Sequence, residues 1–85
     1  MSEGGDIIVA SFAKNQRERV RVALGTYRGV ETADVRLFAR TESGDVPTRA
    51  GLTIRRELLP ELAAALIAAV RAAGLTLPSN VQEGG

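Results

Sequence analysis

The chain of 85 residues contains neither cysteine nor histidine. Their absence excludes disulfide bonds, cysteine–histidine zinc sites, thiol nucleophiles and imidazole acid–base catalysis. Paired carboxylates and a nucleophile elbow are also missing, and residues 25–29 match neither common glycine-rich phosphate loop. We therefore expect a protein without enzymatic activity, and we expect it to use no cofactor and no metal ion.

Long apolar segments are lacking as well. The longest uninterrupted apolar run is nine residues, 62–70, whereas a bilayer-spanning helix needs about 20. Residues 1–6 are polar and acidic, without the charged and apolar regions of a signal peptide. We expect a soluble cytoplasmic protein, associated with the nucleoid if its ligand is DNA.

The charge of the chain is unevenly distributed, although the net charge is only +1. Residues 14–56 carry ten basic and five acidic side chains, and each flanking segment has a net charge of −2. Ten of the 11 basic residues are arginine and 13 residues are alanine, which coding bias alone would also produce. Coding bias does not explain why the basic residues cluster in one part of the chain.

Four segments have the pattern of β-strands. Residues 7–13 form an apolar, β-branched run, and residues 18–24 and 32–41 alternate between apolar and polar positions. Residues 46–54 predict a fourth strand, with Pro47 near its start or on a sheet edge because proline cannot donate a ladder hydrogen bond.

The period changes after the fourth strand. Apolar residues then recur at spacings of three and four, which predicts a helix: Leu59, Leu62, Leu66 and Val70. The helix begins near Arg56, so Pro60 falls in the first turn, where an amide has no intrahelical acceptor, and Gly74 can end it. We expect one α+β domain over residues 7–74, between a disordered segment 1–6 and a flexible tail 75–85.

The alternation divides the side chains of the strands between two faces. One face collects apolar side chains for the helix to cover: Val20, Val22, Leu24, Val35, Leu37, Leu52 and Ile54. In the fourth strand, strict alternation also turns Val46, Thr48 and Ala50 toward this face. The other face collects five arginines and one aromatic residue: Arg19, Arg21, Arg36, Arg40, Arg49 and Phe38.

Five arginines on one sheet face indicate an anionic partner. Like charges at facing positions of neighbouring strands are destabilising, and only Glu18 and Asp34 offset them nearby. Arginine pairs with phosphate through two parallel hydrogen bonds and also stacks on bases, so nucleic acid is the expected ligand. A solvated charged face is the simpler alternative.

Two aromatic residues accompany the arginines. Tyr27 and Phe38 could provide stacking surfaces for unpaired bases. Each has a structural alternative, because Tyr27 could cap a turn and Phe38 could pack in a dimer. Asp34, which lies among basic residues, is more typical of an ion-pair partner than of a catalytic group.

The apolar surface of the predicted helix is wider than packing on one sheet requires. Its apolar side chains span an arc of about 180°, whereas packing on one sheet needs a stripe little wider than ~100°. A chain this short also lacks disulfide or metal support, so oligomerisation is expected. We predict that one side of the helix packs on its own sheet and the other on a second copy of the chain. The dimer interface would include Leu58, Leu62, Leu66, Ile67 and Val70.

Three motifs resemble the core pattern of the transcriptional positive cofactor four family. They are Tyr27-Arg28-Gly29, residues 33–38 (Ala-Asp-Val-Arg-Leu-Phe) and residues 47–54 (Pro-Thr-Arg-Ala-Gly-Leu-Thr-Ile). The family pattern is aromatic–basic–glycine, then hydrophobic–Asp–hydrophobic–Arg–x–aromatic, then a proline- and glycine-containing strand that leads into a helix. The motifs occur in the same order with compatible spacing, and the resemblance covers residues 12–73.

The resemblance implies a homodimer whose curved, four-stranded antiparallel sheets bind single-stranded DNA with little sequence preference. It implies that Tyr27 stacks on bases or lines the channel, and that Arg28 contacts phosphates or bases together with Arg36 and Arg49. Ala39 and Ala50 stand where eukaryotic members tend to have tryptophan and lysine. These differences fit a short bacterial member, which acts in transcription regulation or DNA metabolism, better than they fit a eukaryotic member.

The expected nucleic-acid-binding residues combine the sheet face with the family motifs. They are Arg19, Arg21, Tyr27, Arg28, Arg36, Phe38, Arg40 and Arg49. RNA is an alternative ligand, since the sequence does not distinguish the two sugars. The alternative function is that of a coactivator-type interaction module, which docks an acidic partner of the transcription machinery.

Overall fold

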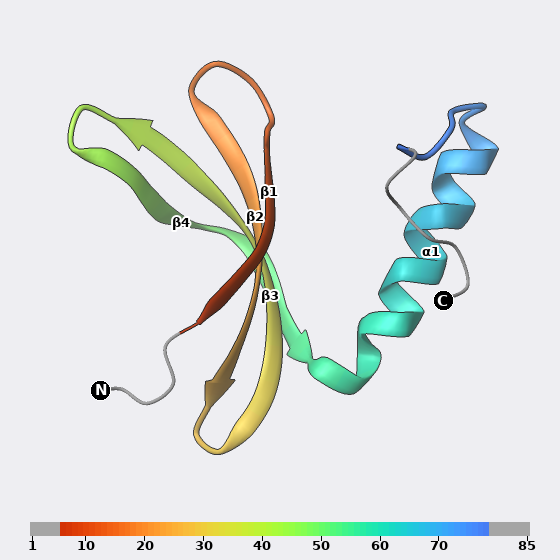
Figure 1. Ribbon diagram of the computed structural model, residues 1–85, viewed down its shortest axis with the longest axis horizontal. Coiled ribbons are helices and arrows are strands. Elements are labelled where there is room, and N and C mark those ends of the chain that lie inside the picture. Colours follow the sequence, from red (N-terminus) through yellow and green to blue (C-terminus); the bar gives the residue numbers. More distant parts are fainter. Residues whose placement is uncertain (1–5, 79–85) are drawn as a thin grey trace.

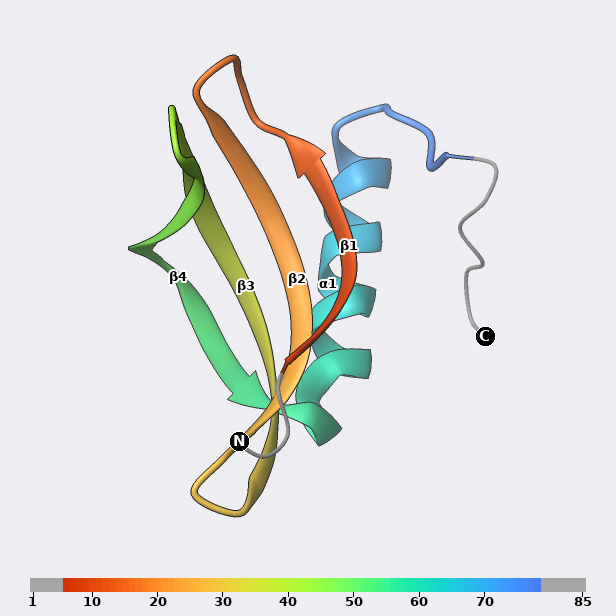
Figure 2. The same cartoon turned by 60° about the vertical axis from the view of Figure 1, so that its left-hand side comes forward.

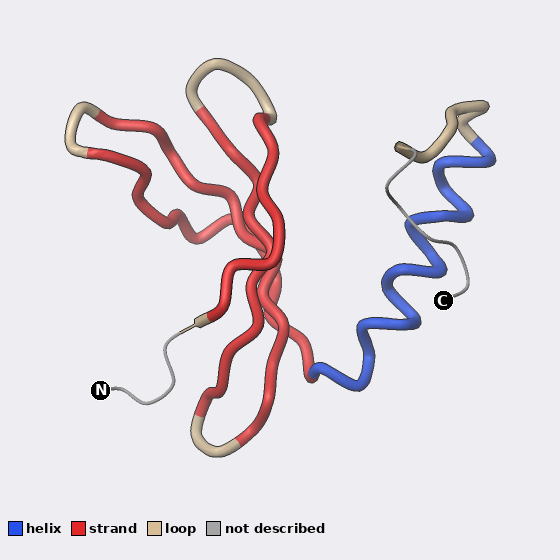
Figure 3. The backbone as a smooth tube through the Cα atoms, viewed as in Figure 1, coloured by secondary structure: helices blue, strands red, loops and turns tan. Residues whose placement is uncertain are grey.

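A computed structural model of the chain describes residues 6–78. Four strands form one curved sheet in the order β1-β2-β3-β4, with each neighbouring pair antiparallel, and a 3-10 helix and an α-helix follow (Figures 1 and 3). The predicted α+β architecture is confirmed. The elements are β1 (Ile7–Ala13), β2 (Glu18–Tyr27), β3 (Val30–Thr41), β4 (Gly44–Arg55), η1 (Arg56–Leu58) and α1 (Leu59–Ala72).

The strand register places the two sets of side chains on opposite faces, as the alternation predicted. Val20 lies opposite Leu37, and Val22 lies opposite Val35. We call this side the apolar face; it consists of Val20, Val22, Leu24, Ala33, Val35, Leu37, Ala39, Val46, Leu52 and Ile54. We call the opposite side the arginine face; it consists of Arg19, Arg21, Arg36, Phe38 and Arg40, with Tyr27 at one end.

The prediction of strict alternation through the fourth strand is wrong at its centre. The register shifts between Arg36 and Phe38 of β3, because Gly51 pairs with Arg36 and Pro47 pairs with Phe38. The residues between them, Thr48 to Ala50, form a bulge that breaks the period of two. Thr48 therefore does not join the apolar face; its hydroxyl donates to the Leu37 carbonyl at 2.8 Å. Pro47 lies on an edge strand, as expected.

The ends of the helix follow the sequence signals. The chain enters η1 at Arg56 and α1 at Leu59, so Pro60 occupies the first turn of α1. Gly74 has a φ of +76°, a left-handed conformation that suits glycine after a helix. The amide of Gly74 donates to the Arg71 carbonyl at 3.0 Å, which satisfies one of the terminal acceptors.

The prediction that α1 packs on its own sheet is wrong. The helix contacts η1 but makes no extensive contact with any strand. It stands apart from the sheet in Figure 1, whereas in the turned view of Figure 2 it overlaps β1 in projection. Arg56 fixes the point of departure, because its Nη2 donates to the Gly25 carbonyl at 2.9 Å and its Nη1 lies 3.8 Å from Glu31 Oε1. From this anchor, α1 leads away from the sheet (Figure 1).

A single copy of the described residues therefore has almost no hydrophobic core. Only Ala33 and Ala23, which are 0% and 8% exposed, count as buried apolar residues. Leu52 on the apolar face is 43% exposed and Leu66 on α1 is 58% exposed. Water-exposed apolar area forgoes about 25 cal/mol of stabilisation per Å², so covering either surface would stabilise the protein.

The remaining expectations concern the chain ends and the membrane. Residues 1–5 and 79–85 lie outside the described part, so the proposed division into segments 1–6, 7–74 and 75–85 stays a prediction. Within residues 6–78, neither helix combines the length and the apolar character that a membrane span requires.

Candidate nucleic-acid interface

Two arginines face each other across β2 and β3 at the centre of the arginine face. We call Arg21 and Arg36 the central pair; the register places them directly opposite one another. Facing like charges repel, and each member of this pair has a carboxylate partner within the chain. The centre of the face is thus internally neutralised.

Arg36 is held by a network of hydrogen bonds. Its Nε and Nη2 donate to the two carboxylate oxygens of Asp34 at 2.9 and 2.8 Å, and its Nη1 donates to the Thr48 carbonyl in the β4 bulge at 3.0 Å. Thr53 Oγ1 donates to the same carboxylate at 2.5 Å. The Arg36 hydrogen bonds are the main cause that lowers the pKa of Asp34 below its ordinary value, and they raise the pKa of Arg36. Asp34 is therefore an ion-pair partner, as the sequence suggested.

Arg21 crosses the face from β2 toward β4. Its guanidinium lies 4.0 Å from the ring centroid of Phe38, and its Nη2 lies 3.5 Å from Asp45 Oδ2. The expectation that only Glu18 and Asp34 offset the arginines was wrong, because Asp45 also does so. The pairing of Arg40 with Asp45 explains this, since it brings the start of β4 beside β3. One face of the Phe38 ring is covered by Arg21.

The β2–β3 turn presents Tyr27 and Arg28 at one end of the sheet. The turn consists of Arg28 and Gly29, with φ of +53° and +81°, the geometry of a tight two-residue hairpin. The Arg28 guanidinium lies 5.3 Å from the Tyr27 ring centroid. Tyr27 is 63% exposed, so its ring is the more accessible of the two predicted stacking aromatics.

Three further arginines of the predicted set remain without a carboxylate partner among the described residues. Arg19 donates to the Ser11 hydroxyl at 3.2 Å, Arg40 lies near the end of β3, and Arg49 lies exposed in the β4 bulge. Arg49 therefore leaves the regular ladder of the arginine face, although it stays on the same edge strand. Each of these three guanidiniums is available to an anionic ligand.

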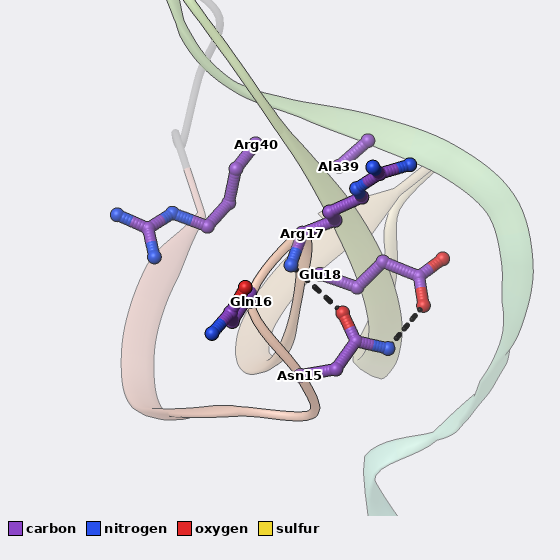
Figure 4. Close-up of a pocket in the computed structure, with 6 residues that line it drawn as sticks. All are labelled: Asn15, Gln16, Arg17, Glu18, Ala39 and Arg40. Atoms are coloured by element: carbon purple, nitrogen blue, oxygen red, sulfur yellow. Dashed lines mark hydrogen bonds between the residues drawn. The ribbon is translucent and has the colours of Figure 1, made fainter.

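A polar hollow of about 440 Å³ connects the hairpin end with the central network. Its lining combines one aromatic ring with donors and acceptors: Asp6, Gly25, Thr26, Tyr27, Thr32, Asp34, Arg36 and Thr53. Arg17 lines a different hollow near Arg40 (Figure 4). Arg17 is not among the binding residues that the sequence predicts, because it precedes the alternating part of the second strand.

Known structures identify the family. The crystal structure of BPSL1147, a PC4 homolog from Burkholderia pseudomallei, matches in its orthorhombic form with a TM-score of 0.72 and 36% sequence identity, over 84% of this chain and 95% of that one. The chain belongs to the PC4 family. The tetragonal form of BPSL1147 gives a TM-score of 0.69 at 36% identity, over 81% of this chain and 100% of that chain.

A more distant PC4 homologue has the same fold. The bacteriophage T5 homologue of the eukaryotic transcription coactivator PC4, implicated in recombination-dependent DNA replication, shares 19% identity at a TM-score of 0.61, over 85% of this chain and 82% of that one. No model of a known protein family matches the chain, and no curated protein matches it. The resemblance that the three motifs suggested is thus confirmed by structure.

Proposed function

We propose that this PC4-family protein binds single-stranded DNA with little sequence preference. The observation that carries the proposal is the juxtaposition, on one curved sheet, of arginines without carboxylate partners and an exposed tyrosine at a hairpin tip. Guanidiniums pair with phosphates, and an exposed ring stacks on any unpaired base, so both contacts tolerate sequence variation.

The predicted binding residues divide into two roles under this proposal. Arg19, Arg28, Arg40 and Arg49 offer guanidiniums to the phosphates of the strand. Arg21 and Arg36 hold the surface in shape through Asp45 and Asp34, and Phe38 supports the Arg21 side chain. Tyr27 offers the accessible ring for a base.

We also propose that the functional form is a homodimer. The apolar face of the sheet and the apolar side of α1 are both uncovered in one copy, and they belong to the same chain. A two-fold related copy can cover both surfaces at once, because a symmetric interface uses the same surfaces twice. The α1 side would contribute Leu58, Leu62, Leu66, Ile67 and Val70.

The cellular role proposed here is transcription regulation or DNA metabolism. The PC4 homologue of bacteriophage T5 is implicated in recombination-dependent DNA replication, and its eukaryotic counterpart is a transcription coactivator. Both processes expose single-stranded DNA, which is the ligand that the arginine face suits.

Fluorescence anisotropy with labelled single-stranded and double-stranded oligonucleotides of equal length tests the proposal. At moderate salt we expect the single strand to bind more tightly, because only unpaired bases expose their faces to Tyr27. Equal affinity for the duplex would refute the proposal. Absence of binding to either oligonucleotide would favour an interaction module for an acidic protein partner.

A further inference from the structure

A second pair of facing arginines lies at the end of the sheet opposite the Tyr27–Arg28 hairpin. The amide of Arg40 donates to the Arg17 carbonyl at 2.8 Å, so the two backbones are neighbours. The pairing continues the β2–β3 ladder, whose last registered pair is Glu18 with Ala39. We call Arg17 and Arg40 the outer pair. Both residues are exposed.

The outer pair differs from the central pair in its electrostatics. Arg21 and Arg36 each have an aspartate, whereas neither member of the outer pair forms an ion pair with a described residue. Facing like charges without a counterion are destabilising in a sheet. An anion from outside the chain would therefore relieve the repulsion between the two outer arginines.

Two neighbouring carboxylates are already engaged. Glu18, which lines the same hollow, accepts hydrogen bonds from Lys14 Nζ and Asn15 Nδ2, both at 3.0 Å. These bonds lower the pKa of Glu18, with Asn15 as the larger cause, so the carboxylate stays ionised beside its own partners. Asp45, which pairs with Arg40 in the β4 register, turns to Arg21 instead.

The turn that carries Arg17 is locally fixed. The amide of Arg17 donates to Asn15 Oδ1 at 2.8 Å, and the amides of Lys14 and Asn15 both donate to the Glu18 carbonyl. Such side-chain-to-backbone bonds hold a short turn in one shape. The outer pair consequently flanks a preformed hollow of about 620 Å³, lined by Asn15, Gln16, Arg17, Glu18, Ala39 and Arg40.

The two guanidiniums of the outer pair diverge. Figure 4 shows the Arg17 and Arg40 side chains extending in different directions from their neighbouring backbones, on two sides of the hollow. Diverging groups do not clamp one phosphate between them. They suit a chain of phosphates that passes over the end of the sheet.

We propose that Arg17 and Arg40 form a subsite for two different phosphodiester groups of one nucleic-acid strand. This inference rests on the proposed function and extends the binding track to the end of the sheet opposite the Tyr27–Arg28 hairpin. It adds Arg17, which none of the family motifs contains, and it makes the subsite specific for a polyanion over a single free phosphate.

The test measures how the affinity for a labelled oligo(dT) of about 16 nucleotides, the upper end of common site sizes, depends on chloride concentration. Each phosphate contact to a single strand contributes about 0.7 to the slope of log K against log salt. We expect Arg17→Gln and Arg40→Gln each to lower the slope by about 0.7, and the double variant by about 1.4. Arg71→Gln, which removes the same charge from the last turn of α1, is the matched control and should leave the slope unchanged.

Three outcomes would overturn the inference. If the wild-type protein binds and the folded double variant keeps the wild-type slope, the outer pair does not contact phosphates, while the proposed function stands. If inorganic phosphate inhibits oligo(dT) binding more strongly than chloride does at equal ionic strength, and the double variant abolishes this extra inhibition, the outer pair clamps a single anion. If the wild-type protein fails to bind oligo(dT), the proposed function fails, and this inference fails with it.

Discussion

On the arginine face the central charges are paired within the chain, whereas on the apolar face the side chains contact one another across the strands but stay partly exposed. Arg36 is tied to Asp34, and Arg21 to Asp45 and Phe38, so that part of the surface is complete in one copy. The apolar face and α1 are left with Leu52 and Leu66 exposed. The difference shows that the two faces differ in what one copy leaves unpaired, and under the proposals above a polyanion binds the free arginines while a second copy covers the apolar side.

The largest effect should follow from charging the apolar side of α1. In Ile67→Glu we expect loss of the dimer and a destabilisation of about 3–5 kcal/mol, the cost typical of an uncompensated buried charge. Light scattering and thermal unfolding measure both effects. Ala68→Glu, about 100° further round the helix and on the side away from Leu62, Leu66 and Val70, is the control and should stay dimeric. A stable wild-type monomer at micromolar concentration would contradict the comparison.

The next largest effect concerns the network under the arginine face. Arg36→Ala removes the donors to Asp34 and to the Thr48 carbonyl, which are part-buried, and hydrogen bonds to a charged group contribute about 1.5–3 kcal/mol. We expect a lower midpoint in chemical unfolding. Arg49→Ala removes an arginine from the neighbouring bulge without breaking a hydrogen bond of this network, so its stability should match the wild type. Equal stability of both variants would show that the network does not support the sheet.

Substitutions of the two aromatic residues should have different effects, one on DNA binding and the other on stability. Tyr27→Ala should weaken single-strand binding by about 1–3 kcal/mol, the usual value of one stacked base, and should leave the fold intact because the ring is exposed. Phe38→Ala should instead lower stability, because Arg21 packs on that ring. Anisotropy and thermal unfolding of both variants measure the contrast. Unchanged affinity of folded Tyr27→Ala would remove this ring from the interface.

At acidic pH, the interactions of the arginine face should lose their contribution to folding stability before those of the apolar face do. The pKa of Asp34 is lowered in the folded state by its bonds to Arg36. The stability that this adds is present above the unfolded pKa of about 3.9 and is lost as pH falls through the lower folded value. Unfolding midpoints between neutral and strongly acidic pH should show this loss. In Asp34→Asn the dependence should be weaker; an unchanged pH profile would count against the role of Asp34.

The smallest effect should come from Asp45, whose bond to Arg21 is partly exposed. Asp45→Asn removes a negative charge from the face and frees Arg21 for the ligand, so we expect tighter binding by about 0.2–1 kcal/mol, the range of exposed ion pairs. Titrations at low salt measure it best. Glu57→Gln, which releases Arg55 at the end of β4, provides a control of equal charge change. Weaker binding by Asp45→Asn would show that Asp45 orients Arg21 for the ligand.

Much of the fold could be predicted because its signals are local. The period of two in residues 18–24 and 32–41 assigned the faces correctly, and Pro60 and Gly74 placed the limits of the helix. The strict alternation missed the bulge at Thr48–Ala50, although Pro47 and Gly51, residue types that often mark bulges, flank it. Its extent depends on the register with β3, which the pattern of β4 alone does not give. In the site, the pairing of Asp34 with Arg36 was predictable, since residues two apart on a strand share a face.

The sequence by itself determined the strands, the helix, the separation of arginines from apolar residues and the three motifs of the PC4 family. Only the tertiary structure decided which arginines are neutralised. Asp45 reaches Arg21, and Arg17 comes beside Arg40, through the register of neighbouring strands, which is a non-local property. The structure also decided that α1 leaves its own sheet. Hydrophobicity is non-directional, so an apolar stripe indicates that a surface must be covered without specifying which surface covers it.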